Sequence, residues 1–203
     1  FIDRSGCIWI CTGDGVYCCR ELKDLNTEHV KIEPASNREW SNYVRHISNI
    51  GNDRLAVTTR ANMTYIYNTR TQQRTVEMQT DACVYDYAID PQGRKWIATK
   101  GGGIYIDGVR YWKYEKEHYA PGIAFYKTIF DKQGRAWIAT WGEGLLITPQ
   151  KTGQQPRKFE QFLNADGKEA QIHDLILDRK GRLWVCSNNG ILMVNTAEKD
   201  ITA

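Results

Sequence analysis

The sequence predicts an all-β fold made of β-propeller blades, each with four antiparallel strands. The first observation is a ten-residue phrase with an Asp near its start, a central Trp and a Thr or Ser at its end. Five copies of it, the second degenerate, occupy residues 3–12, 50–59, 90–99, 131–140 and 178–187. The second observation is the spacing. The Trp column falls at positions 9, 56, 96, 137 and 184, and intervals of about 40 to 47 residues are those of propeller blades.

The phrase itself predicts a turn followed by a strand. In Asp-x-x-Gly the carboxylate can accept backbone N–H groups at the corner, and Gly can take a positive φ. Apolar, partly β-branched runs precede the turn at residues 84–89, 125–130 and 172–177 and predict the inner strands. The Trp-to-Thr part predicts the second strand of each blade. Because alternate residues share a face, each Trp should lie beside the small residue two positions later, where neighbouring blades pack.

Two further strands follow each phrase. A Gly-bearing turn leads into short apolar runs at residues 16–17, 104–106, 145–147 and 191–194, which predict the third strands. Polar segments with interspersed aromatic residues, at 109–114 and 158–162, predict outer strands, and Trp112 in the first of them is expected to pack within its blade.

The composition excludes several classes of protein. The 203 residues are 41% hydrophobic and 25% charged with a net charge of +3, which argues against disorder, collagen-like structure and a nucleic-acid partner. No apolar stretch approaches the roughly 20 residues of a membrane helix, so no membrane contact is expected. The chain holds about 4.6 blades and begins with Phe1. We expect an open fragment of a larger, seven-bladed propeller in preference to a closed five-bladed ring, forming a single segment over residues 1–203.

Asp-x-x-Gly-Arg-x-Trp-Ile-Ala-Thr followed by Gly-Gly-Gly-Ile, as at residues 90–104, resembles the two-component regulator propeller repeat. The resemblance implies the periplasmic sensor region of a bacterial hybrid two-component system, a membrane receptor that couples glycan fragments outside to a histidine kinase and response regulator inside. It also implies a second receptor chain as partner, forming a homodimer. The family's complete sensor has two seven-bladed propellers and a β-sandwich module, so this chain would be about a third of it. No catalytic residue, cofactor or metal is implied for this part.

Two adjacent columns at the start of the inner strands are polar or titratable. They contain Arg45, Tyr85, Tyr126 and His173, then His46, Asp86, Lys127 and Asp174. These eight residues predict a polar ring at the mouth of the channel. The ring could contact an oligosaccharide ligand, or be polar only because it meets water.

The connections on the same predicted face add aromatic and charged residues: Trp40, Asn42, Tyr43, His118, Tyr119, Trp141 and Glu143. Trp141 is the most informative, because Gly13, Lys100 and Asn188 stand at the same turn position in other copies. An exposed indole can stack on the C–H face of a pyranose while polar neighbours bond its hydroxyls. Alternatively, Trp141 covers its own hairpin or meets a partner protein.

The six cysteines are Cys7, Cys11, Cys18, Cys19, Cys83 and Cys186. Cys11 and Cys186 stand in the small-residue column that Ala98 and Ala139 hold elsewhere, which favours buried free thiols over one disulfide. Cys7 and Cys11 are too far apart along a strand for one metal ion. If Gly13 and Asp14 form a two-residue loop, Cys18 lies opposite Trp9 and Cys19 opposite Ile8.

Three functions therefore remain open. The favoured one is a non-catalytic sensor fragment that detects glycan fragments. The second is a scaffold for protein–protein interaction. The third, less favoured, is a propeller lyase that uses His46 and His173 with Asp86 or Asp174, since no motif for a nucleophile or a phosphate site is present.

Overall fold

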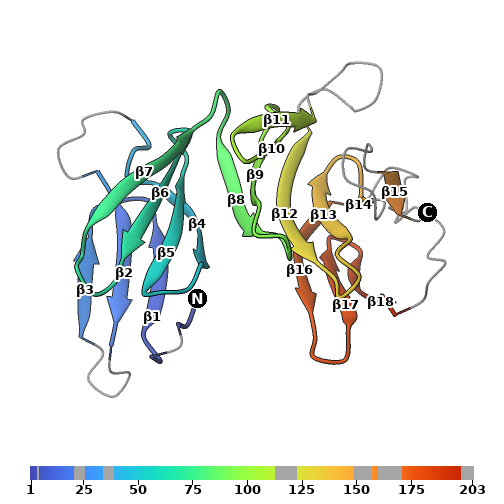
Figure 1. Ribbon diagram of the computed structural model, residues 1–203, viewed down its shortest axis with the longest axis horizontal. Helices are drawn as coiled ribbons and strands as arrows, with labels where there is room; N and C mark the ends of the chain where they lie inside the picture. The colour runs from blue at the N-terminus through green and yellow to red at the C-terminus, as the bar shows by residue number, and fades with distance from the viewer. Residues whose placement is uncertain are drawn as a thin grey trace. The chain divides into compact units, whose positions relative to one another are not determined.

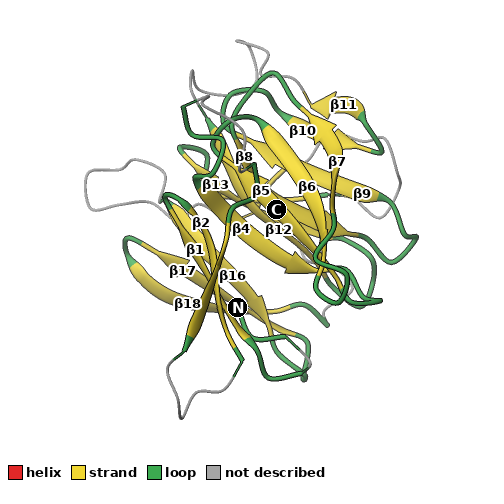
Figure 2. Cartoon of the chain, turned by 90° about the vertical axis from the view of Figure 1, so that its left-hand side faces the viewer, coloured by secondary structure: helices red, strands yellow, loops and turns green. Residues whose placement is uncertain are grey.

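A computed structural model describes residues 1–3, 5–20, 26–33, 39–112, 123–148, 157–159 and 171–197. Contacts divide the chain into two compact units, Phe1–Tyr87 and Ala88–Ala203, which we describe one at a time. The described residues contain 18 strands in five antiparallel sheets and no helix, and so no helix that could cross a membrane (Figures 1 and 2). The predicted all-β fold is confirmed.

The first unit contains two sheets. Three strands form the sheet β1-β2-β3, and four form the sheet β4-β5-β6-β7. Their bounds are β1 (Ile8–Thr12), β2 (Gly15–Cys19), β3 (Thr27–Val30), β4 (Val44–Asn49), β5 (Arg54–Thr59), β6 (Met63–Asn68) and β7 (Arg74–Gln79). The boundary between the units falls within β8 (Val84–Ile89).

The remaining sheets have the orders β11-β10-β9-β8, β12-β13-β14-β15 and β16-β17-β18. Their strands are β9 (Lys95–Thr99), β10 (Ile104–Ile106), β11 (Val109–Trp112), β12 (Ala124–Phe130), β13 (Ala136–Trp141), β14 (Leu145–Ile147), β15 (Arg157–Phe159), β16 (Ile172–Leu177), β17 (Arg182–Ser187) and β18 (Gly190–Asn195). The inner strands predicted at 84–89, 125–130 and 172–177 are therefore present. The Trp112 side chain, His118 and Tyr119 lie outside the described part.

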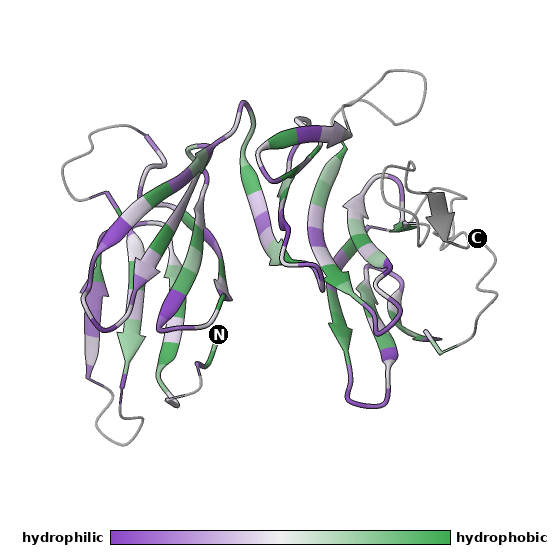
Figure 3. Ribbon diagram, viewed as in Figure 1, coloured by the Kyte–Doolittle hydropathy of each residue, from purple (hydrophilic) through white to green (hydrophobic). Residues whose placement is uncertain are grey.

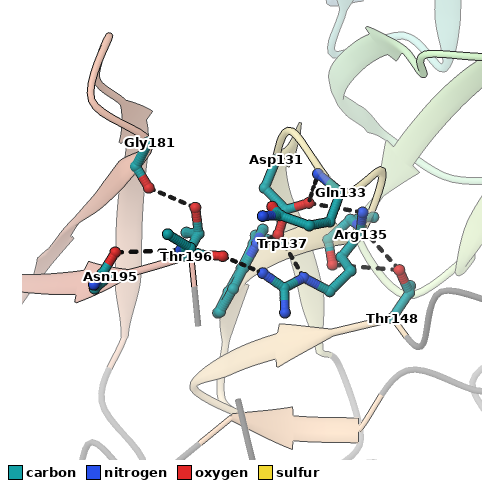
Figure 4. A network of polar contacts seen from close by, with 10 residues as sticks. Asp131, Gln133, Arg135, Trp137, Thr148, Gly181, Asn195 and Thr196 are labelled. Carbon is teal, nitrogen blue, oxygen red and sulfur yellow. Dashed lines mark hydrogen bonds and ion pairs between the residues drawn. The ribbon is translucent and has the colours of Figure 1, made fainter. Parts of the chain in front are cut away.

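The repeated Asp organises each turn and also holds the Trp. In the fourth copy, Asp131 Oδ1 accepts the N–H groups of Gln133 and Arg135, at 3.0 and 2.9 Å. Its Oδ2 accepts Arg135 Nε at 2.6 Å and Trp137 Nε1 at 2.8 Å. Arg135 also donates to the carbonyl of Thr196, near the end of the next sheet (Figure 4). One buried carboxylate thus joins the turn, the second strand and the neighbouring blade.

The same arrangement recurs around Asp90 and Asp178. Burial opposes the ionisation of Asp90, but hydrogen bonds from the Trp96 indole and from Arg94 outweigh it and lower the pKa of this carboxyl. The pKa of Asp178 is also lowered, first by the N–H of Arg182 and then by the Trp184 indole. The Arg and Trp of the phrase are therefore conserved partners of one Asp within the chain.

Apolar cores lie between successive sheets within each unit. Trp96 and Ala98 of β9 pack in one cluster with Phe125 of β12, and Trp137 and Ala139 of β13 pack in another with Leu175 of β16. The expected pairing of a large ring with a small residue is confirmed. Figure 3 shows hydrophobic residues along β12 and β13 and a hydrophilic turn between β16 and β17.

The cysteines follow the prediction only in part. Trp9 lies opposite Cys18 and Ile8 opposite Cys19, as the two-residue loop predicts, and all six thiols are free. Cys11, however, is exposed, and Cys186 is half-buried. The burial expected for Cys11 is wrong because β1 is the edge strand of its sheet, with no inner strand beside it.

Candidate functional site

An irregularity in the inner strands positions the predicted polar residues. The pairing of β4 with β5 shifts between Val44 and His46, so that Arg45 is an extra residue. The equivalent shifts in β12 and β16 make Tyr126 and His173 the extra residues. A β-bulge bends the strand and re-aims side chains, so the strict alternation of faces is broken where the two polar columns stand. The predicted residues consequently form two groups, one in each unit.

The first group surrounds Arg45 in the first unit. The Arg45 guanidinium carbon lies 5.2 Å from the ring centroid of Tyr43 and 5.0 Å from that of Tyr85. Arg60 lies 3.9 Å from the centroid of Trp40 and 5.6 Å from that of Tyr43, and the Trp40 and Tyr43 rings meet edge to face at 5.6 Å. We call these five residues the Arg45 cluster. Two cations alternate with three aromatic rings, an arrangement stabilised by cation–π attraction.

His46 and Asp86 lie together in the same unit. His46 Nε2 is 3.0 Å from Asp86 Oδ1 and 2.8 Å from Ser48 Oγ, and Ser48 donates its hydrogen to the Tyr87 carbonyl at 2.6 Å. The serine oxygen must therefore accept from His46, which assigns the hydrogen to Nε2. Because the histidine donates to Ser48 and does not accept its proton, these three residues are not arranged to activate a nucleophile.

The second group surrounds Trp141 in the second unit. The Trp141 ring centroid lies 6.0 Å from that of Tyr126 and 6.2 Å from that of His173, and the Tyr126 and His173 centroids are 6.5 Å apart. Trp141 is 44% exposed, and Lys127 forms an ion pair with Asp174 at the adjacent position of each strand. We call these five residues the Trp141 cluster. It combines an accessible indole with neighbouring hydrogen-bonding groups.

Two residues predicted from the connections lie elsewhere. Glu143 is buried, and its N–H donates to Thr140 Oγ1 within the turn, so it is not on the exposed surface beside Trp141. Asn42 uses its amide to bind the N–H and the carbonyl of Glu33, which gives it a structural role. Both are polar residues that satisfy the backbone of a connection.

Sequence reasoning missed Arg60 and Ser48. Arg60 follows Thr59, the last residue of the degenerate copy, and therefore stands in the same turn column as Trp141. Comparing that column across all five copies would have found it. Ser48 carries no signal in the sequence, because its contact to Tyr87 joins strands from different blades.

The repeat places this chain among β-propeller proteins with two-component regulator repeats. Residues 166–189 match the family model described as two component regulator propeller, which confirms the resemblance carried by the repeated phrase. A sequence comparison with curated proteins returns no match.

Solved structures share the fold. The extracellular domain of the B. thetaiotaomicron hybrid two component system BT4673 aligns with 100% of this chain and 29% of its own, at a TM-score of 0.74 and 21% identity. The corresponding domain of BT3049 from the same organism aligns with 97% of this chain and 27% of its own, at 0.71 and 21% identity. This chain thus spans less than a third of either domain.

Enzymes also share the fold. A catalytically inactive virginiamycin B lyase from Staphylococcus aureus, solved with quinupristin, aligns with 98% of this chain and 66% of its own, at a TM-score of 0.70 and 15% identity. At these identities, the likeness establishes the propeller fold, and the function must be argued from the clusters themselves.

Proposed function

We propose that this chain is part of the extracytoplasmic, periplasmic sensor region of a hybrid two-component receptor, and that its second unit binds a glycan fragment. The observation that carries the proposal is the Trp141 cluster. The repeat model and the B. thetaiotaomicron domains support the receptor class. They do not bear on the ligand.

The chemistry of the cluster suits a sugar. An indole that is 44% exposed offers a flat apolar surface for the C–H face of a pyranose, and the Tyr126 and His173 rings hold it in place through ring contacts. The turn below is fixed, because Thr140 donates its N–H and its hydroxyl to the Gly144 carbonyl. Lys127 and Asp174 can exchange part of their ion pair for sugar hydroxyls. A rigid site of this kind needs little reorganisation on binding.

Signalling would follow from differential contacts. A glycan that binds one arrangement of the receptor more tightly than another shifts the population toward that arrangement, and a second receptor chain is the partner through which the shift would reach the kinase. The proposal requires no catalytic step in this chain.

The test is calorimetric titration of the intact sensor region with oligosaccharides from several polysaccharide classes. We expect one class to bind, and Tyr126→Ala combined with Trp141→Ala to weaken it at least about tenfold, or about 1.4 kcal/mol. Tyr111→Ala is the matched control, because Tyr111 is an exposed ring (41%) on β11 of the same unit. Equal binding by the double variant would remove the Trp141 cluster from the site. Self-association without binding of any glycan would favour the protein–protein scaffold.

A further inference from the structure

Arg45 is a cation without a counterion among the described residues. Its guanidinium lies between the Tyr43 and Tyr85 rings, and its Nε is buried with no hydrogen-bond partner. The nearby carboxylate of Asp86 is 3% exposed and is bound by His46. Ring faces attract a cation but accept few of its N–H groups, so the buried Nε–H retains an unmet requirement for an acceptor.

Arg60 and Trp40 provide a second cation and an exposed plate beside it. Arg60 lies over the Trp40 ring at 3.9 Å, and neither arginine forms a hydrogen bond or ion pair within the described part of the chain. Trp40 is 40% exposed and has a φ of 68°, in the left-handed region that bulky residues rarely adopt. Backbone strain of this kind is retained where surrounding structure holds it, and is often found at ligand sites.

We propose that the Arg45 cluster is a subsite for an acidic sugar, which would present a carboxylate or a sulfate to Arg45 and Arg60 and its ring face to Trp40. A planar guanidinium donates two parallel hydrogen bonds to either oxyanion, and an oxyanion would supply the acceptor that Arg45 Nε lacks. This inference rests on the proposed function in that the ligand is a glycan. It adds a charge requirement at a separate cluster, in the first unit.

The experiment titrates the intact sensor region with three probes of equal length: an oligogalacturonate, a sulfated oligosaccharide and a neutral oligosaccharide. Arg45→Gln and Arg60→Gln should each weaken binding of the acidic probe at least about tenfold and leave neutral binding unchanged. Arg70→Gln is the control, because it removes an equal charge from a side chain of the same unit that is 80% exposed. It should change binding less than about twofold. The stronger of the two acidic probes identifies the oxyanion.

Trp40→Gly separates ligand contact from folding. Glycine accepts a φ of 68° without strain, so this variant should be at least as heat-stable as the parent while binding the acidic probe more weakly. It also keeps the test decisive if Arg45→Gln fails to fold.

Three results would overturn the subsite. One is acidic binding that Arg45→Gln and Arg60→Gln leave intact. Another is equal binding of an acidic peptide such as oligoglutamate. The third is binding of the neutral probe alone, with loss in the Tyr126 and Trp141 double variant, which would retain the proposed function and reject the acidic subsite. If no glycan binds, both proposals fail together.

Discussion

Replacement of Asp131 by Asn tests whether the repeated Asp–Arg–Trp arrangement carries the stability of the second unit. The change keeps the shape of the side chain but removes its charge and converts one acceptor into a donor. Arg135 would then keep only its bond to Thr196, although its side chain is 6% exposed. Removing one partner of a buried ion pair typically costs about 3–5 kcal/mol, because the other charge stays buried.

The assay is urea unfolding of the parent and the variant, followed by tryptophan fluorescence and circular dichroism. Asp178→Asn is the internal comparison, since it makes the same chemical change where the Asp and Arg side chains are 22% and 39% exposed. Its effect should be distinctly smaller because water can replace the lost contacts. A loss below about 1 kcal/mol for Asp131→Asn, or an equal loss for both variants, would refute the argument from burial.

Three further predictions concern pH, thiol reactivity and the turns. The folded-state pKa of Asp90 is lowered, so its contribution to stability is complete at neutral pH and is lost as the pH falls below about 4; urea midpoints at pH 7 and pH 3 should differ less in Asp90→Asn than in the parent. Burial raises the pKa of Cys18 to about 11, and Cys11 is exposed, so mass spectrometry after brief alkylation at pH 8 should find Cys11 labelled and Cys18 unlabelled until the protein unfolds; early labelling of Cys18 would contradict its burial. Gly15→Ala should destabilise the protein more than Gly51→Ala, because both have positive φ but only at Gly15 would a Cβ meet a backbone atom, the Val30 carbonyl oxygen at 2.5 Å; equal melting temperatures would show that the β2–β3 region gives way.

The sequence predicted most of the blade structure because the information is local. The phrase places a turn, a ring and a small residue at fixed offsets, and a two-residue loop fixes which residues face one another across a hairpin, as for Trp9 and Cys18. Strand bounds, hairpin register and the packing of Trp137 beside Ala139 follow from these short-range rules. The bond from Asp131 to the Trp137 indole spans only six residues, yet a pattern of residue types does not reveal which donor a carboxylate will meet.

The candidate sites depended on contacts that no local rule specifies. The sequence by itself determined the propeller repeat and the polar columns at the start of each inner strand, because both recur with the period of the chain. Only the tertiary structure showed the bulges at Arg45, Tyr126 and His173, the partnership of Arg60 with Trp40, and the burial of Glu143. The physical reason is that exposure, and the meeting of rings and charges from separate strands, are set by how neighbouring strands and sheets pack and not by spacing along one strand.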